Sequence, residues 1–325
     1  MLWPGECVRL QDNDLTFREQ DVPEIVMPSF LVDDARATDA FLEVIAEMLK
    51  PALARSAKPL VEISGGFDSS CVAIAARSIG KDLYSYGLIH EGAVGVQQVN
   101  RRSELVRLIG ASDFEFPSSV YTPFKALASE ECVRTHMDDN HRLSCVSAVD
   151  AHPEGSFDLV LSGIGGDELT SEDTFKRAKW EVQGNIPSSS LVGSVGRADM
   201  FMRRGIWPSN PLAAQPVIDF CRALPPTMRK SRMLNVLTLA RAGLSDGFIF
   251  PRYREHYGNA MQREASLIDF DAMLGESILA DYGIFDASNL LQQARDASTD
   301  GFSYRLIGQL WCVMKLEAVL RRYIT

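Results

Sequence analysis

The stretch Ser64-Gly65-Gly66-Phe67-Asp68-Ser69 decides the fold, because an apolar segment, Leu60–Ile63, leads into it and a helical pattern, Ser69–Ile79, leads out of it. Two adjacent glycines let the backbone turn tightly and expose amide hydrogens, and the serine hydroxyls add hydrogen-bond donors. The amino end of the helix that follows contributes partial positive charge. A strand, a glycine-rich loop and a helix in this order predict a cradle for a phosphate chain.

This loop lacks the G-x-x-x-x-G-K-[ST] pattern that holds the terminal phosphates in kinases and GTPases, so a different bond of ATP is expected to react. The pattern S-G-G-x-D-S resembles the pyrophosphate-binding loop of the ATP pyrophosphatase superfamily, whose members split ATP into AMP and pyrophosphate. The resemblance implies that Asp68 helps to place magnesium. The nucleotide-binding residues that it implies here are Ser64, Gly65, Gly66, Asp68, Ser69 and Ser70.

A second glycine-rich segment, Ser162-Gly163-Ile164-Gly165-Gly166-Asp167-Glu168, follows another apolar stretch, Asp158–Leu161. It resembles the S-G-x-G-x-D-E motif in the synthetase domain of the asparagine synthetase family. The resemblance implies that Ser162 and Gly163 approach the nucleotide and that Asp167 is a second magnesium ligand, sharing the ion with the first loop. Alone, the segment could be a glycine-rich turn with solvated acids. The prediction depends on the pairing of the two loops.

The likeness covers roughly residues 1–260 and is looser outside these loops. Leu2–Gly5 and a predicted hairpin over residues 6–19 resemble the tail of the family's glutamine-hydrolysing domain. Cys7 lies within a strand pattern instead of at an exposed amino terminus, so we do not expect this chain to hydrolyse glutamine. Ser209–Leu212 occupies the place of the family's V-P-F-L-D segment. Pro251-Arg252-Tyr253-Arg254 resembles its R-x-K stretch, which implies that Arg252 or Arg254 neutralises charge on the reacting phosphates.

Two departures from the family's pattern argue against plain asparagine synthesis. Ile164 stands where asparagine synthetase has a proton-accepting glutamate and β-lactam synthetase a tyrosine, and isoleucine cannot transfer protons. Arg254 replaces a lysine and keeps its charge but cannot act as a base. The Gly-Gly-Asp-Glu variant resembles the lasso-peptide macrolactam cyclases. We therefore expect amide formation through an adenylated carboxylate, with ATP and Mg²⁺ as cofactors and peptide macrolactam cyclisation as the leading reaction.

Two other functions remain open. One is an asparagine synthetase-like amidotransferase whose glutaminase is a separate chain, docked by the amino-terminal hairpin. The other is a non-catalytic module that binds ATP or AMP, which the two departures would favour. The expected partners are a substrate bearing a carboxylate and an amine, a peptide in the leading interpretation, and a separate glutaminase-like or precursor-processing protein.

Composition limits the remaining classes. The chain has 325 residues, of which 46% are hydrophobic and 23% charged, as in an ordinary globular protein. Its formal charge of -10 disfavours nucleic acid as a partner. No apolar run approaches the roughly 18 residues of a membrane span, and the six cysteines show no C-x-x-C spacing. A cytoplasmic protein without membrane or nucleic-acid partners is expected.

The pattern between Leu60 and about Gly166 alternates strands with helices, which is typical of a parallel sheet with helices on both faces. Ligands bind beyond the carboxyl ends of such strands, where both loops fall. We predict an α/β fold of the ATP pyrophosphatase type with a helical C-terminal region, divided into an amino-terminal segment 1–30, a synthetase domain 31–230 and a helical part 231–325. The expected strands are 60–63, 83–89, 113–116 and 159–162, and the expected helices are 69–79, 102–109 and around 132–149.

Several weaker expectations concern local structure. Thr38 and Asp39 are predicted to cap a helix that Pro51 bends or ends. Apolar stripes over residues 233–240 and 307–318 predict core helices. Glycine- or serine-rich stretches around residues 184–196 and 209–216 predict loops.

Some side chains could serve the site less directly. Tyr86 and Gly87 are predicted to offer backbone contacts to adenine, with His90 and Glu91 either beside it or in a surface loop. His136 and His141 have side chains that can bind metals. Their spacing puts them on different helical faces, so a metal site there is not expected. A solvated helix face is expected for three basic residues, Lys176, Arg177 and Lys179.

Overall fold

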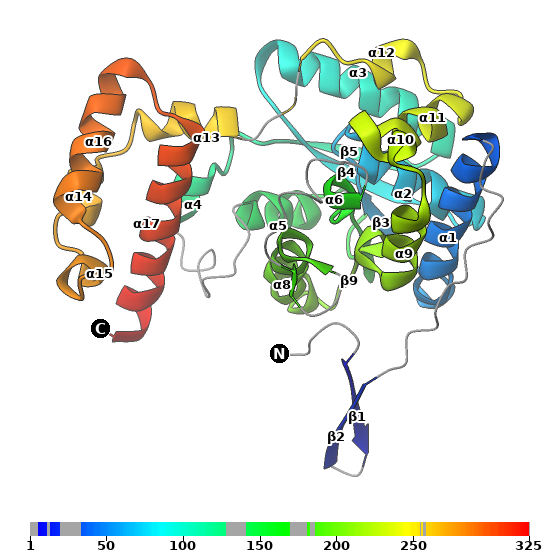
Figure 1. Cartoon of the computed structure of the whole chain (residues 1–325), viewed down its shortest axis with the longest axis horizontal. Helices are drawn as coiled ribbons and strands as arrows, with labels where there is room; N and C mark the ends of the chain where they lie inside the picture. The colour runs from blue at the N-terminus through cyan, green and yellow to red at the C-terminus, as the bar shows by residue number, and fades with distance from the viewer. Residues whose placement is uncertain are drawn as a thin grey trace.

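The computed structural model describes residues 6–11, 14–19, 34–127, 141–169, 181–182, 186–253, 255 and 258–324. At its centre is a sheet of five parallel strands in the order β5-β4-β3-β6-β9 (Figure 1). The strands are β3 (Pro59–Glu62), β4 (Tyr84–Ile89), β5 (Ser112–Pro117), β6 (Leu159–Leu161) and β9 (Trp207–Ser209). The four strands expected from the sequence are confirmed to within one residue at each end, and β9 is an additional edge strand.

Helices cover both faces of the sheet because side chains alternate along each strand. Val61 and Leu161 point into one hydrophobic core, whereas Leu60 and Val160 point into another. The first core is formed with α1 (Asp34–Arg55), α2 (Phe67–Ser78), α3 (Gly92–Ile109), α9 (Gln215–Ala223), α11 (Met233–Arg241) and α12 (Asp246–Ile249). The second is formed with α5 (Arg142–Asp150) and α8 (Ser188–Met202). The predicted parallel sheet with helices on both faces is confirmed.

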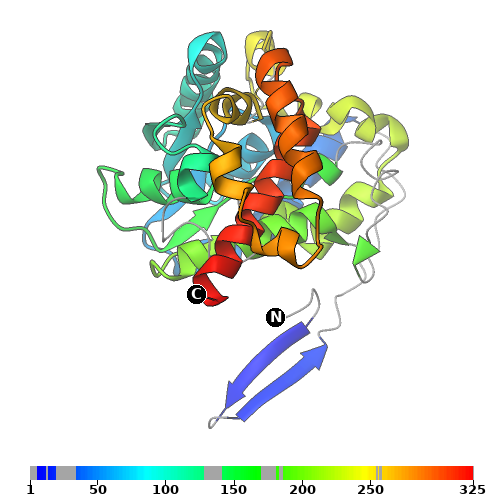
Figure 2. The same ribbon diagram turned by 90° about the vertical axis from the view of Figure 1, so that its left-hand side faces the viewer.

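A third hydrophobic core lies within a group of helices beside the sheet, and this group of helices faces the viewer in Figure 2. Its longest helix buries Ile307, Leu310, Trp311 and Met314, so the apolar stripe predicted there is confirmed. The helices are α4 (Pro123–Leu127), α13 (Gly258–Ala265), α14 (Phe270–Leu274), α15 (Ile278–Asp281), α16 (Ala287–Asp300) and α17 (Tyr304–Ile324). The helical C-terminal region is therefore confirmed. Among the described helices, none has the length and apolar character needed to cross a bilayer.

The remaining elements are short. A predicted hairpin is confirmed as β1 (Glu6–Gln11) paired with β2 (Asp14–Glu19), and it projects from the body in Figures 1 and 2. A second small hairpin pairs β7 (Glu181–Val182) with β8 (Ile186–Pro187). The other short segments are α6 (Gly166–Leu169), η2 (Pro211–Ala213), α10 (Pro226–Arg229) and η3 (Lys230–Arg232).

The first helix differs from its prediction at both ends. Because α1 begins at Asp34, Thr38 and Asp39 lie inside it instead of capping it, and the Thr38 hydroxyl donates to the Ala35 carbonyl at 2.8 Å. The helix also continues past Pro51 to Arg55. Leu49 and Leu53 on either side of the exposed proline are fully buried, and their burial outweighs the one backbone hydrogen bond that proline removes.

Two further expectations were wrong. The serine-rich stretch around residues 184–196 contains the start of α8, which is anchored by the buried Met200 and Phe201 near its other end. In α11, the predicted inward stripe begins with Met233, but Met233 is exposed and Leu234, Asn235, Thr238 and Leu239 are buried. The helix is rotated relative to the apolar pattern, since its buried face includes two polar residues.

Candidate functional site

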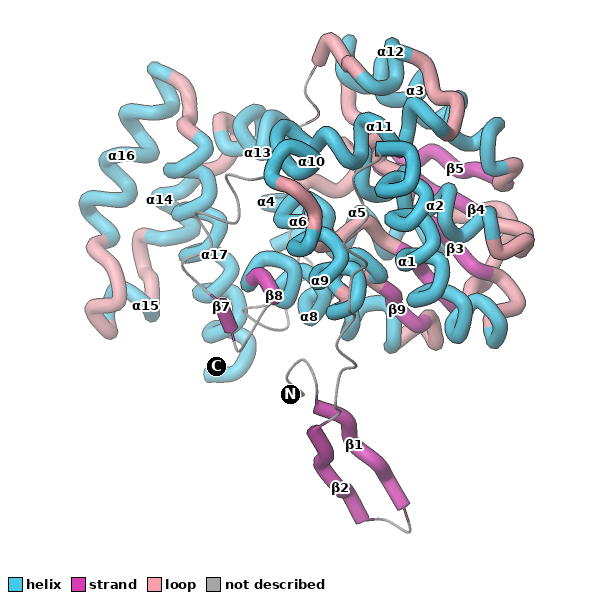
Figure 3. The backbone as a smooth tube through the Cα atoms, turned by 45° about the vertical axis from the view of Figure 1, so that its right-hand side comes forward, coloured by secondary structure: helices cyan, strands magenta, loops and turns pink. Residues whose placement is uncertain are grey.

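The sheet topology places both glycine-rich loops at the carboxyl ends of two adjacent strands. The chain passes from β3 outward to β4 and β5 on one side, and from β6 outward to β9 on the other. The neighbours β3 and β6 therefore form the point where the strand order reverses, and ligands of open parallel sheets bind at the carboxyl ends of such strands. The first loop, Ser64–Ser69, follows β3 and leads into α2, and the second loop, Ser162–Glu168, follows β6 and leads into α6. β3, α2 and α6 are labelled in Figure 3.

The first loop is pre-shaped by contacts within itself. Gly65 has φ +88°, a conformation that side chains rarely adopt, and Gly66 is the residue before α2. The Gly66 amide donates to the Ser64 hydroxyl at 3.0 Å, and the Ser70 hydroxyl donates to the Gly66 carbonyl at 2.6 Å. Ser64 and Ser69 join their hydroxyls at 3.2 Å. Gly66 supplies no side-chain acceptor to the first turn of α2, which leaves the helix end suited to an anion.

The second loop is supported by the segment after β9. The Ser162 amide donates to the Ser209 carbonyl at 3.1 Å, and the Ser162 hydroxyl donates to the Asn210 side chain at 2.5 Å. Asn210 in turn donates to the Ser194 hydroxyl of α8 at 2.9 Å. Gly165 has φ +100°, and a Cβ there would lie 3.0 Å from the backbone nitrogen of Ala213. The segment matched to the family's V-P-F-L-D therefore holds the second loop in position.

The two loops touch each other directly. A Cβ added to Gly163 would lie 2.5 Å from the Ser69 nitrogen and 3.0 Å from the Asp68 carbonyl carbon. A Cβ on Gly166 would overlap the carboxyl group of Asp68. Only glycine allows this approach without moving one loop. The two loops that the sequence pairs are thus in direct contact in the structure.

The carboxylates predicted to hold magnesium converge on one cation of the protein itself. Arg232, at the start of α11, donates to the Asp68 carboxylate through Nη2 and lies 3.1 Å from Asp167 Oδ1 through Nη1. The Asn235 side-chain amide donates to the other oxygen of Asp68 at 3.0 Å. Arg232 also lies over the Phe67 ring, with its Cζ 5.3 Å from the ring centroid. Asp68 and Asp167 are therefore close enough to share a ligand.

The two carboxylates of this cluster stabilise the positive charge of Arg232. Burial alone would lower the pKa of Arg232, but the adjacent Asp68 and Asp167 outweigh it and raise that pKa above its ordinary value. Behind Asp68, burial raises the pKa of the Cys71 and Cys221 thiols, so both are neutral at physiological pH. These cysteines pack the core and offer no thiolate to the site.

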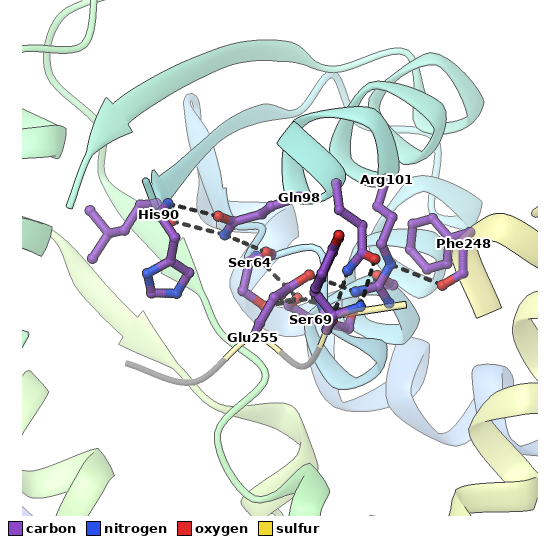
Figure 4. Close-up of polar contacts among 12 residues, drawn as sticks. Ser64, Ser69, His90, Gln98, Arg101, Phe248 and Glu255 are labelled. Atoms are coloured by element: carbon purple, nitrogen blue, oxygen red, sulfur yellow. Dashed lines mark hydrogen bonds and ion pairs between the residues drawn. The ribbon is translucent and has the colours of Figure 1, made fainter. Parts of the chain in front are cut away.

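A buried glutamine ties the first loop to the neighbouring strand (Figure 4). The Gln98 amide nitrogen donates to the Ser64 carbonyl at 2.7 Å and to the Leu88 carbonyl at 2.9 Å. Its oxygen accepts from the His90 amide at 3.0 Å. Gln98 is thus fully used in joining the carboxyl ends of β3 and β4. His90 lies at this edge of the sheet, as expected, and Glu91 is the residue before α3, 3.6 Å from Arg263.

Glu255, just after the segment that resembles R-x-K, lies against the first loop. Arg101 pairs with Glu255 at 2.6 Å and donates to the Phe248 carbonyl at 2.9 Å, while a Cβ on Gly65 would lie 3.5 Å from Glu255 Oε1 (Figure 4). Burial raises the pKa of Glu255, and Arg101 opposes this in part. Beside this ion pair, both amide atoms of the Gln97 side chain bond to the Tyr253 backbone, at 2.7 and 2.9 Å. Arg252 is exposed. Arg254 lies outside the described residues.

Tyr86 and Gly87 occupy the interior of the sheet instead of a surface that adenine could reach. Tyr86 is fully buried, and its carbonyl already accepts from the Ile63 amide at 2.8 Å. A Cβ on Gly87 would overlap the guanidinium of Arg102, which is also fully buried and donates to the Ile63 carbonyl. Strand pairing thus uses the Tyr86 carbonyl, and Arg102 fills the space beside Gly87 where adenine was expected.

The remaining candidates contribute little to the site. Within the described part of the chain, no group of three or more His, Cys, Asp or Glu side chains is arranged to hold a metal ion. His136 lies outside the described residues, as do Lys176, Arg177 and Lys179, and His141 precedes α5. Ile164 lies beside α8, with its nearest carbon 3.4 Å from a Cβ placed on Gly193. Ile164 offers no proton acceptor there.

Sequence reasoning missed the residues that complete the cluster. No sequence motif contains Arg232, Asn235 or Gln98, and each contacts the first loop from another part of the chain. One signal was present in the sequence: Asn235 interrupts an apolar helical run, and a polar residue on a buried helix face needs a partner. Its partner, Asp68, is 167 residues away, so only the fold reveals the pair.

Comparison with known proteins places few limits on the site. No family model matches the sequence, and no curated protein matches it. An NH3-dependent NAD synthetase from Campylobacter jejuni is 13% identical with a TM-score of 0.39, over 88% of this chain and 96% of that one. An NMN synthetase from Francisella tularensis is 11% identical with a TM-score of 0.31, over 69% of this chain and 99% of that one. These likenesses are too distant to assign a function, which must come from the site itself.

Proposed function

We propose that the protein binds ATP with Mg²⁺ between its two loops and forms an amide bond, releasing AMP and pyrophosphate. One observation carries the proposal: Asp68 of the first loop and Asp167 of the second contact the same guanidinium, that of Arg232. Two glycine-rich loops that follow adjacent strands at the reversal of strand order thus form a single site. Such a site suits one ligand that carries both phosphates and a sugar.

The first loop suits the phosphate chain. Its glycines place backbone close to the crevice, and the amino end of α2 lies beside it without a side-chain cap. The second loop approaches so closely at Gly163 that a nucleotide in the crevice would contact both loops. Ser64, Gly65, Gly66 and Ser69 would face the phosphates, and Ser162 and Gly163 the α-phosphate and ribose. The fully buried Ser70 would support the loop through its hydrogen bond to Gly66.

The donor set also fits magnesium. Mg²⁺ is commonly held by one or two carboxylates, with water and substrate phosphates completing its shell. Asp68 and Asp167 are two such carboxylates, and they already converge on one cation. They would hold Mg²⁺, which would supply neutralisation of charge on the phosphates. Within the described residues no third acidic ligand joins them, so phosphates of the nucleotide and water would have to complete the shell.

The reaction balances as two displacements. A carboxylate oxygen of the substrate attacks the α-phosphorus, the bond to the bridging oxygen breaks, and pyrophosphate leaves with its electron pair. An amine nitrogen then attacks the acyl carbon, AMP leaves, and the amine loses one proton to water. Arg252 and Arg254 are the proposed cations for the departing phosphates. Because Ile164 cannot accept the proton, holding the amine close to the acyl carbon would supply much of the acceleration, up to about 7–11 kcal/mol.

For the substrate we propose a peptide whose amino terminus is joined to an Asp or Glu side chain, as in lasso-peptide macrolactams. The Gly165-Gly166-Asp167-Glu168 sequence supports this choice. The two alternatives are an amidotransferase that receives ammonia from a separate glutaminase chain and a module that binds the nucleotide without turnover. Product analysis separates all three.

The test is to incubate the purified chain with Mg²⁺, ATP labelled in the α-phosphate and linear precursor peptides. The proposal predicts labelled AMP, an equal amount of pyrophosphate and a peptide lighter by one water. ADP as the product would refute it. Amide formed only with ammonium or an added glutaminase would favour the amidotransferase. Nucleotide binding that never yields pyrophosphate would favour the non-catalytic module.

A further inference from the structure

Arg232 occupies the position between the two carboxylates that the proposed function gives to a metal. Its two terminal nitrogens reach Asp68 and Asp167 separately, so the guanidinium bridges the first and second loops. The side chain is about one quarter exposed, lies against the Phe67 ring and keeps Nε buried with no hydrogen-bond partner among the described residues. This single positive charge is shared by two carboxylates, so it offsets only part of their negative charge.

The backbone around Arg232 shows that this placement is imposed by its surroundings. Within the described residues, only Ser231 and Arg232 are non-glycine residues with positive φ, at 50° and 60°. Side-chain-bearing residues adopt this left-handed conformation only where the surrounding structure compensates for the strain. At Arg232 the ion pair with Asp68 and Asp167 contributes to that compensation, so the carboxylates that would bind the metal also help to hold the start of α11 in this form.

A metal ion on these carboxylates and the guanidinium exclude each other. Both would use the Asp68 and Asp167 oxygens, and a divalent cation there would lie within a few ångströms of a second positive charge, which is strongly repulsive. The Asn235 oxygen beside Asp68 is buried without a hydrogen-bond partner among the described residues, so the cluster retains unused acceptor capacity. The two carboxylates thus have two alternative cationic partners.

We propose that Arg232 holds the place of Mg²⁺ in the nucleotide-free protein, so that the metal enters only together with ATP. The inference rests on the proposed function, since it takes Asp68 and Asp167 as the metal ligands. Free Mg²⁺ brings no additional ligand and must displace the guanidinium against its full attraction to two carboxylates. A metal carried by ATP brings phosphate ligands and negative charge, which compensate the released guanidinium.

The test measures Mn²⁺ binding without nucleotide, from the electron paramagnetic resonance signal of unbound Mn²⁺. Arg232→Gln removes the competing charge, and Arg232→Met also preserves the apolar contact with Phe67. Arg241→Gln is the matched control, since Arg241 lies on the same helix and pairs with Asp39 at the surface. Unfolding is monitored by circular dichroism, and binding of Mn²⁺·ATP to the unaltered chain is measured by calorimetry.

The proposal predicts that both Arg232 variants bind Mn²⁺ at least about tenfold more tightly than the unaltered chain, that Arg241→Gln leaves the affinity unchanged, and that adding Asp68→Asn to Arg232→Gln abolishes the gain. Equal or weaker Mn²⁺ binding by a folded Arg232 variant would overturn the inference while leaving the proposed function intact. Failure of the unaltered chain to bind Mn²⁺·ATP would overturn the proposed function, and with it the inference.

Discussion

The substitution Gly163→Ala tests whether contact between the loops builds the site. Its Cβ would lie 2.5 Å from the Ser69 nitrogen, whereas ordinary van der Waals contact begins at 3.4 Å. The loops would therefore have to separate by about 0.9 Å. Because the contacted Ser69 nitrogen is a backbone atom in the first turn of α2, no flexible side chain can absorb this shift. Overpacking of this kind costs about 1–3 kcal/mol of folding free energy.

The functional loss should be about as large in free energy as the loss of stability, and it should appear in protein that remains folded. A displacement of about 1 Å between groups that hold a reacting substrate can cost about 10²-fold in rate. We therefore expect Gly163→Ala to remain folded, to bind ATP·Mg²⁺ at least about tenfold more weakly and to release pyrophosphate about 10²-fold more slowly. Urea unfolding followed by circular dichroism gives the first quantity, calorimetry the second and a coupled pyrophosphate assay the third.

A matched control separates this effect from the general cost of adding a methyl group. Gly308 lies in α17 with nothing within 4 Å of its would-be Cβ. Gly308→Ala should therefore stabilise the protein by about 0.5–1 kcal/mol and leave nucleotide binding unchanged. If Gly163→Ala bound ATP as tightly as the unaltered chain, the two loops would not form one nucleotide site.

Three further outcomes are expected. Gln98→Leu should weaken ATP binding by about tenfold in calorimetry, because the Ser64 carbonyl and the adjoining strand end lose their shared donor. Burial lowers the pKa of His152, although the Ser85 carbonyl opposes this, so the unfolded chain takes up the proton at higher pH than the folded protein does. The free energy of unfolding, measured in urea, should therefore fall as the pH drops below about 6.5. His152→Gln should make the free energy of unfolding depend less on pH in that range. Glu317→Gln should cost about 1–3 kcal/mol in the same assay.

Each of these predictions has a contradicting result. ATP affinity unchanged in Gln98→Leu would show that the strand ends hold their positions without it. A pH slope that persists in His152→Gln would assign the acid sensitivity elsewhere. For Glu317, which burial alone would make harder to ionise, hydrogen bonds from Ser277, Arg321 and two backbone amides lower the pKa below its ordinary value. If Glu317→Gln were neutral, those bonds would contribute nothing net.

The strands and the two loops could be predicted because their signals are local. Leu60–Ile63 and Leu159–Leu161 are apolar runs that end at glycines, and in a parallel sheet this places both turns at one edge. β9 could not be predicted, since three residues containing a proline give no strand pattern. Its position follows from pairing with β6 and not from its own sequence.

The contacts that complete the site are of long range and were invisible in the sequence. Arg232 lies beside, and Asn235 within, the apolar stretch 233–240, and periodicity does not show that a polar side chain there will find a buried carboxylate. Tyr86 and Gly87 were assigned to adenine from their strand, but Arg102 fills the space beside them. In both cases the contacting side chain lies on a different helix or strand, so only the tertiary packing shows which residues meet.

The most direct test of the central claim is the crystal structure of the chain with Mg²⁺ and an ATP analogue whose α–β bridge is a methylene group. The account predicts a single nucleotide in the crevice after β3 and β6, its phosphates on the first loop, its α-phosphate also reaching the second loop, and Mg²⁺ on Asp68 and Asp167. A nucleotide bound to one loop alone, or elsewhere on the protein, would contradict it.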